Sequence, residues 1–190
     1  MKMPSPITVC INGDSTVGAG LQFDGLDRQI TTNVLDMGGA NLTLAAITTA
    51  GRVVVTIGGK PQALVVSLRD LQRISELIMS SYYRLFQQGA GAMADIPAGI
   101  AVTRWVSPFG TIDIIGSRYI QSEYNLAKAY LIDDKSVTND GNAICMVDLM
   151  PISSIDLALL QTAYRTLVAE FTVLMMTIEA FQCKIVNILQ

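Results

Sequence analysis

Residues 105–120, W-V-S-P-F-G-T-I-D-I-I-G-S-R-Y-I, constrain the fold most, because they have the pattern of two strands joined by a tight turn. Pro108 fixes its backbone φ at about −65°, and Gly110 can adopt the positive φ that turns require. Ile112 and Ile114 are β-branched and favour an extended backbone. The segment therefore predicts a β-hairpin, and it points to a structural role rather than to a catalytic one.

The composition is apolar for a chain of this size. Of its 190 residues 51% are hydrophobic and only 15% are charged, with a mean hydropathy of +0.43, whereas an ordinary globular chain is about 25% charged. The longest strongly apolar run, residues 171–178, is far shorter than the roughly 20 residues that a membrane-spanning helix needs. The excess apolar surface therefore predicts contacts between subunits and no contact with a membrane.

The N-terminal residues, the cysteines and the net charge argue against secretion, disulfide bonds and tight binding of nucleic acid. The start, M-K-M-P-S-P-I-T-V-C, has no apolar core of a secretory signal, so we expect a cytoplasmic chain. Cys10, Cys145 and Cys183 lie far apart without a C-x-x-C motif, and we expect three buried thiols. The net charge of −3 and the scattered basic residues argue against tight binding of nucleic acid.

The chain has no histidine, which removes Ser-His-Asp and Cys-His catalysis and every histidine metal ligand. The motif I-N-G-D-S-T-V-G-A-G at 11–20 is interpreted as a loop. Gly58-Gly59-Lys60 is followed by proline, lacks a phosphate-binding pattern and is better explained as a helix end. Asp133 and Asp134 follow an apolar strand and are expected to cap a turn. We therefore predict no enzyme, no catalytic, cofactor-binding or metal-binding residue, and no cofactor.

Periodicity predicts a loop-rich segment at 1–40, with one or two short strands, and then a helix near 42–58 with Asn41 as its N-cap. A short buried strand is expected at 63–66. A second helix near 68–86 begins at a capping box of Ser67 and Asp70. The apolar stripe of the first helix is Leu44, Ile47, Val54 and Ile57. The stripe of the second is Leu68, Leu71, Ile74, Leu77 and Ile78. The alternation of strands and helices predicts a mixed layer in which both helices cover a sheet.

In the second half of the chain, the sequence pattern predicts strands at 127–132, 143–149 and 183–189. The segment from Ile155 onward fits two patterns. A helical stripe would use Leu157, Leu160, Tyr164, Leu167, Phe171, Leu174 and Ile178. Strand alternation would use Leu167, Ala169, Phe171, Val173 and Met175. The pattern alone leaves both alternatives open.

The order of these motifs resembles the C-terminal half of tailed-phage major capsid proteins, which have the Hong Kong 97-like fold. Over residues 100–190 the motifs S-P-F-G-T-I-D-I-I, S-R-Y-I, A-Y-L-I-D, M-V-D-L-M-P, A-E-F-T-V-L-M and C-K-I-V-N-I-L follow one another as in that family. F-D-G-L, the first helix, G-G-K-P and V-V-S also resemble the axial domain upstream. By this resemblance residues 169–175 form a strand.

The resemblance implies an α+β fold in which a mixed sheet with flanking helices forms an axial domain and long strands form a peripheral domain. The division would be a loop-rich segment at 1–40, an axial domain at 41–125 with a hairpin at 101–116, and C-terminal strands at 126–190. The loop at 87–99 would meet its copies at the centre of a capsomer. Its candidate contact residues are Gln87, Gln88, Met93, Asp95, Ile96 and Pro97.

The same resemblance implies a shell subunit that forms pentamers and hexamers of an icosahedral virion around double-stranded DNA, assembled in the host cytoplasm. Its partners would be its own copies, neighbouring capsid, cement or portal proteins, and DNA only non-specifically. An N-terminal arm, an extended loop and a spine helix are not recognisable, so the subunit is reduced, or shortened, or a second chain supplies them. The alternatives are an encapsulin-like compartment, another phage structural component, or a small cytoplasmic α/β ligand-binding module or enzyme.

Overall fold

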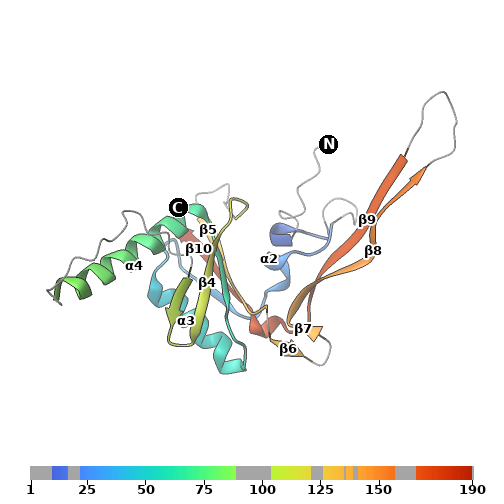
Figure 1. The fold of residues 1–190 in the computed structure, drawn as a ribbon. Helices are drawn as coiled ribbons and strands as arrows, with labels where there is room; N and C mark the ends of the chain where they lie inside the picture. Colours follow the sequence, from blue (N-terminus) through green and yellow to red (C-terminus); the bar gives the residue numbers. More distant parts are fainter. Residues whose placement is uncertain are drawn as a thin grey trace.

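The computed structural model describes residues 10–16, 22–88, 104–120, 126–134, 136–138, 141–156 and 166–189. A six-stranded mixed sheet lies at the centre, in the order β1-β10-β5-β2-β4-β3 (Figure 1). Its strands are β1 (Val34–Asp36), β2 (Ala63–Val66), β3 (Arg104–Ser107), β4 (Gly110–Gly116), β5 (Leu126–Ile132) and β10 (Cys183–Leu189). The pairs β1–β10 and β2–β4 are parallel, and the other pairs are antiparallel.

The predicted hairpin is confirmed as β3 and β4, and Gly110 takes the positive φ, 129°, that the turn requires. The hydroxyl of Ser107 donates to the carbonyl oxygen of Gly110 at 2.8 Å and accepts from the N–H of Phe109 at 3.2 Å. Phe109 lies against α3 (Leu44–Ile57), where a Cβ on Gly51 would be 3.2 Å from its ring. The turn therefore joins the two strands and also docks the hairpin on the helix.

Helix α3 begins two residues later than the sequence pattern indicates. The N-cap is Thr43, whose hydroxyl accepts from the N–H of Ala46 at 3.2 Å, and the prediction of Asn41 was wrong. Both residue types cap well, but the backbone first becomes helical after Thr43. The C-terminal end is as predicted, with Gly58 in the left-handed conformation at φ 105°.

The buried face of α3 is formed by Ile47, Ala50, Gly51 and Val54. Ile57, which was predicted in this stripe, is 47% exposed. At 100° per residue it lies 60° from Val54, at the edge of the stripe, so it turns away from the sheet. The small residues were missed because a stripe of large apolar residues was expected.

Helix α4 (Leu68–Gln88) has the predicted cap. The hydroxyl of Ser67 accepts from the N–H of Asp70 at 3.1 Å and lies 2.8 Å from its carboxylate. Ile74 and Ile78 are buried against the sheet. Leu68 is 50% exposed, contrary to prediction, because it lies about 120° from Ile74 around the helix axis.

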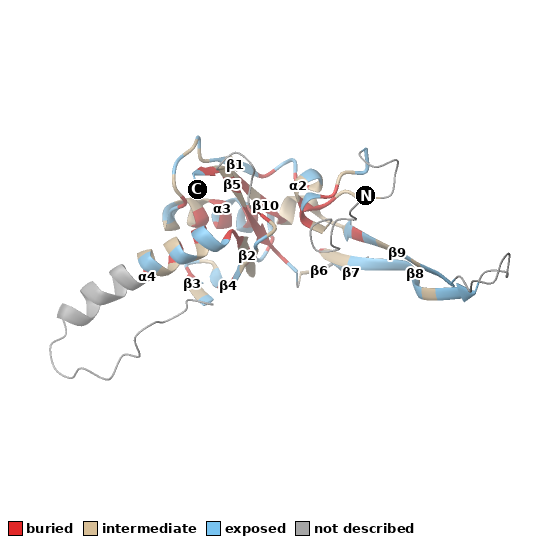
Figure 2. Ribbon diagram, turned by 90° about the horizontal axis from the view of Figure 1, so that it is seen from above, coloured by how far each residue is buried: buried red, intermediate tan, exposed pale blue. Residues whose placement is uncertain are grey.

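The sheet is covered on both faces, and alternate residues of its strands serve the two layers. Leu64 and Val66 of β2 face α3 and α4, whereas Ala63 and Val65 face the other way. The second face is covered by the N-terminal segment, including α2 (Leu26–Gln29), and by the base of a separate two-stranded sheet. Both predicted helices therefore lie on one side of the sheet. Figure 2 shows the buried strands between these layers.

The remaining elements form a second arm of the molecule. Strands β8 (Ile144–Asp156) and β9 (Thr166–Met176) pair as a long antiparallel ribbon that projects away from the sheet on the side opposite to α4 (Figure 1). A short hairpin, β6 (Val137–Thr138) and β7 (Gly141–Asn142), lies near its base, and the 3₁₀-helix η1 (Glu179–Phe181) leads into β10. The strand predicted at 143–149 is thus confirmed but continues to residue 156.

Candidate assembly surface

The β8–β9 ribbon is the largest exposed apolar feature among the described residues. Most of its length is exposed to solvent (Figure 2). Ten of its large apolar side chains are exposed. They are Met146, Val147, Leu149, Ile152, Ile155, Leu167, Val168, Phe171, Val173 and Met175. Exposed apolar side chains gathered on one element, rather than scattered singly, mark an interaction surface.

Six of these side chains, Val147, Ile155, Leu167, Phe171, Val173 and Met175, share one face through the alternation of β9. Residues that lie directly opposite each other across an antiparallel pair share a face, and successive residues on a strand point to opposite faces. We define the apolar ribbon face by its ten residues: Leu167, Ala169, Phe171, Val173 and Met175 of β9, with Cys145, Val147, Met150, Ser153 and Ile155 opposite them on β8. This face carries no charged residue.

The opposite face has a different character. At the base of the ribbon Ile144, Leu174 and Met176 pack against Ile11 and Leu26 of the N-terminal segment. Farther along, polar pairs cross between the strands. The hydroxyl of Thr172 donates to Asp148 at 2.7 Å, and that of Thr166 donates to Asp156 at 3.0 Å. The opposite face therefore packs on the subunit's own core at its base and carries charged residues farther along, whereas the apolar ribbon face carries no charge and is left largely exposed.

A cluster of charged groups fixes the N-terminal segment beside the ribbon. The Asp27 carboxylate of α2 accepts from the ammonium of Lys128 at 2.7 Å and lies 3.5 Å from that of Lys184. Burial pushes the pKa of Asp27 upward, but the hydrogen bonds and charges of the two lysines outweigh it and hold the pKa below its usual value. Burial, with the nearby Asp27 charge, raises the pKa of Tyr130. The cluster joins α2 to β5 and β10.

A second set of contacts fixes the chain where it leaves the ribbon for the sheet. The Glu179 carboxylate accepts from the N–H groups of Thr31 and Thr32 and, at 2.8 Å, from the hydroxyl of Thr32. Burial acts to raise the pKa of Glu179, and these hydrogen bonds outweigh it and lower the pKa. The amide of Asn33 donates to the carbonyl oxygens of Ala180 and Gln182 at 2.7 and 3.0 Å. The orientation of the ribbon is thus tied to the start of β1.

Of the acidic pair at 133–134, Asp133 has the predicted structural role. Asp133 is fully buried, and its carboxylate accepts from the N–H groups of Ser136 at 2.9 Å and Lys60 at 2.7 Å. Its own N–H donates to the side-chain oxygen of Gln182 at 2.8 Å. Asp134 is exposed. The carboxylate of Asp133 therefore caps a turn and connects two strand ends.

The cysteines differ from the prediction of three buried thiols. Cys183 is buried in the sheet, and burial raises its pKa to about 11. Cys10 and Cys145 are only half-buried, since both lie at the base of the exposed ribbon, where Cys10 is 4.0 Å from the sulfur of Met146. In the part of the chain that the structure describes, no three Cys, Asp or Glu side chains are grouped as metal ligands. No helix within the described ranges is long and apolar enough to span a bilayer.

The predicted contact loop is placed only in part. Gln87 and Gln88 belong to the last turn of α4 rather than to a loop, because glutamine is a good helix former and the first glycine follows them. Met93, Asp95, Ile96 and Pro97 lie outside the described residues. The role of all six at a capsomer centre stays a prediction. The strand that the resemblance implied at 169–175 is confirmed as part of β9, although the apolar pattern alone also allowed a helix.

Comparisons with known proteins agree with this architecture. The chain has the fold of an encapsulin from Synechococcus elongatus PCC 7942, with a TM-score of 0.58 at 10% identity over 87% of this chain and 57% of that one. The capsid of an empty GTA particle matches with a TM-score of 0.53 at 12% identity over 95% of this chain and 60% of that one. The predicted α+β, Hong Kong 97-like fold is confirmed, and the chain spans about three fifths of the length of these relatives.

Sequence comparison identifies the family. No curated protein sequence matches the chain significantly. The sequence model of the SU10 major capsid protein family, in contrast, matches residues 8–172, which is most of the chain and includes every strand of the sheet except β10, both α3 and α4, and most of the ribbon. The chain therefore belongs to the SU10 major capsid protein family.

Proposed function

We propose that this chain is a structural subunit of a virion shell, whose copies assemble into pentamers and hexamers of an icosahedral capsid around double-stranded DNA. The observation that carries the proposal is the apolar ribbon face, which a single folded subunit leaves exposed. An isolated two-stranded ribbon is at best marginally stable in water unless a further layer covers its apolar face. Burial against a neighbour would supply that layer.

Neighbouring copies of this chain are the proposed source of the cover. Permanent subunit interfaces are large, about 2,000 to 5,000 Å², and relatively hydrophobic, which agrees with a chain that is 51% hydrophobic. A second polypeptide that supplies an N-terminal arm, an extended loop and a spine helix is a further proposed partner. Cement or portal proteins would contact the finished shell.

The remaining parts of the proposal follow from the shell role. The role is structural, with no enzymatic activity and no cofactor. Assembly would occur in the host cytoplasm. The net charge of −3 supports only weak, non-specific contact with packaged DNA. The division into a loop-rich segment at 1–40, an axial domain at 41–125 and C-terminal strands at 126–190 belongs to the same proposal.

The test compares two charge insertions on opposite faces of β9. Phe171→Asp places a carboxylate on the apolar ribbon face, and Val168→Asp places the same group on the opposite face at a position that is also exposed. We expect Phe171→Asp to abolish particles in sedimentation velocity and negative-stain microscopy, and Val168→Asp to retain them. Circular dichroism checks that both variants fold. Equal assembly of both variants would refute the role of this face.

An encapsulin-like compartment is the second candidate, because one of the solved relatives is an encapsulin. The fold is common to both, so the discriminating property is the content of the particles. Shells made during infection that contain double-stranded DNA support the virion. Shells that enclose protein cargo and no DNA support the compartment.

A further inference from the structure

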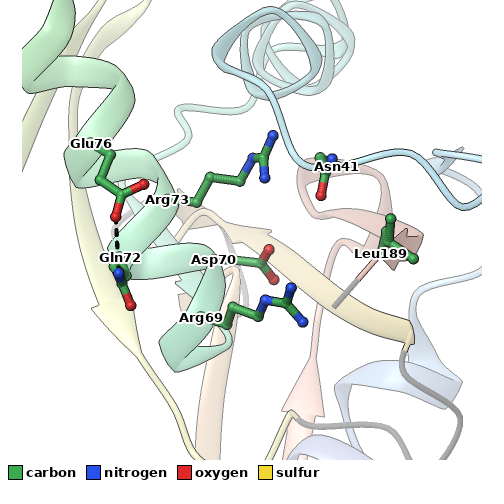
Figure 3. Close-up of a pocket in the computed structure, with 7 residues that line it drawn as sticks. All are labelled: Asn41, Arg69, Asp70, Gln72, Arg73, Glu76 and Leu189. Atoms are coloured by element: carbon green, nitrogen blue, oxygen red, sulfur yellow. Dashed lines mark hydrogen bonds between the residues drawn. The ribbon is translucent and has the colours of Figure 1, made fainter.

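A polar hollow lies where the first turns of α4 face the loop before α3 and the end of β10. It has a volume of about 130 Å³, well above the roughly 10–15 Å³ that a cavity needs to admit one water molecule. Figure 3 shows Arg69 and Arg73 extending from α4 into it, with Asn41 and Leu189 on the far side. The hollow is distant from the ribbon and belongs to the other arm of the molecule.

Arg69 and Arg73 bring two positive charges to a hollow that is also lined by Asp70 and Glu76. Among the described residues neither Arg69 nor Arg73 forms an ion pair, and the Nε of Arg73 is buried without a hydrogen-bond partner. A buried donor left unsatisfied costs about 1–3 kcal/mol, and more when it is charged. Water in the hollow can satisfy this donor, whereas an anionic group from outside the subunit would satisfy it and also pair with its charge.

The carboxylates that line the hollow already have partners on their own helix. Asp70 lies 2.8 Å from the hydroxyl of Ser67, and Glu76 accepts from the side-chain amide of Gln72 at 2.9 Å. Figure 3 shows the Gln72–Glu76 pair on the side of α4 away from Asn41. The N-terminal turns of a helix also carry a partial positive charge, so arginines placed there favour an added anion.

We infer that this hollow receives a carboxylate side chain from a neighbouring copy of the chain, an inference that rests on the proposed shell function. A planar guanidinium matches a carboxylate with two parallel hydrogen bonds, and two guanidiniums on one helix face can share both oxygens. The chain has 16 acidic residues and 13 basic ones, so a neighbouring copy has carboxylates in excess that could bind these arginines. A DNA phosphate has similar chemistry, but the overall negative charge of the subunit opposes it.

The geometry of a ring supports a contact of this kind. Copies related by five- or six-fold rotation meet through two different patches, one from each side of the subunit. The donor of the carboxylate is therefore expected on a surface remote from the hollow. A pair buried at such an interface fixes the register between neighbours more than it adds affinity.

The experiment replaces each arginine with a neutral residue of similar length. We expect Arg73→Gln and Arg69→Gln to lower the fraction of subunits in capsomers, with association weakened by about tenfold per contact, the effect of losing one hydrogen bond to a charged group. Arg52→Gln, which removes an exposed arginine from α3, is the matched control and should assemble like wild type. Arg73→Lys keeps the positive charge but loses the planar guanidinium that makes two parallel hydrogen bonds. Its fraction of assembled subunits should therefore lie between those of wild type and Arg73→Gln.

The outcomes separate this inference from the proposed function. If wild type forms no capsomers, the shell proposal fails. If wild type assembles and both arginine variants assemble equally well, the carboxylate site is wrong. If the arginine variants assemble normally but co-sediment with less double-stranded DNA, the hollow binds phosphate and the inference is overturned. Because Arg69 is exposed, Arg69→Gln tests the site even if Arg73→Gln fails to fold.

Discussion

Phe171 of β9 lies directly opposite Met150 of β8, between two places where the register of the ribbon shifts. Each shift adds one residue to β8, so β8 does not alternate regularly, whereas β9 alternates without interruption. The two shifts keep Val147, Met150 and Ile155 of β8 opposite apolar residues of β9. The result is a ribbon with one uncharged, mostly apolar face, which has the properties of a surface that is covered on assembly.

The two-layer packing predicts a large cost for truncating the centre of α4. Ile74 is fully buried against the sheet, so Ile74→Ala should lower the free energy of unfolding of the dissociated subunit by about 2–5 kcal/mol. Leu68→Ala, at an exposed position on the same helix, should cost under about 1 kcal/mol. Urea denaturation followed by circular dichroism measures both. Similar losses would contradict the assigned orientation of the helix.

The start of α3 makes a second prediction. Thr43→Ala removes the hydroxyl that accepts from Ala46 and should cost about 1 kcal/mol of stability. Asn41→Ala should cost less than about 0.5 kcal/mol, because this side chain caps nothing. Thermal denaturation of the two variants decides between the two caps, and a larger loss at residue 41 would restore the sequence-based assignment.

Gly59 is predicted to tolerate no side chain. A Cβ there would lie 2.7 Å from Cγ1 of Val54 and 3.2 Å from the backbone of Phe181, and neither neighbour can move easily. Gly59→Ala should therefore destabilise the subunit by about 1–3 kcal/mol. Gly116→Ala is the control, because its closest neighbours are the flexible ends of Leu71 and Leu68. Chemical denaturation showing equal losses would contradict this packing.

The Asp27 cluster predicts how stability depends on pH. The pKa of Asp27 is lower in the folded chain than in the unfolded one, so its contribution is complete above the unfolded value of about 3.9 and is lost as the pH falls through the folded value. The difference in unfolding free energy between wild type and Asp27→Asn should therefore narrow as the pH falls from about 6 to about 3. A constant difference over this range would show that the lysines do not act on Asp27.

The sequence predicted the sheet better than the ribbon, for identifiable reasons. The hairpin at 105–116 and the strand Cys183–Leu189 carry turn residues and β-branched runs that act locally. The segment around Phe171 fits a helix or a strand equally well, and only its pairing with a strand more than 15 residues away decides. Local patterns cannot show such pairings, nor can they show that Ala50 and Gly51, rather than larger residues, form the centre of the α3 face.

The hollow at Arg69 and Arg73 could not have been predicted from the sequence. The two arginines are four residues apart, which is the helical spacing of an ordinary solvated face. Their significance depends on Asn41 and Leu189, which lie far away in the sequence and close the hollow from the other side.

The central claim is that the apolar ribbon face is covered when the subunit assembles, and thiol labelling tests it most directly. Ala169→Cys places a thiol on that face, and Ser154→Cys places one on the opposite face of the same ribbon. Maleimide labelling, located by mass spectrometry, should be fast for both in dissociated subunits and strongly suppressed at residue 169 alone in assembled particles. Equal labelling at 169 before and after assembly, or a chain that stays a 20.5 kDa monomer, would contradict the account.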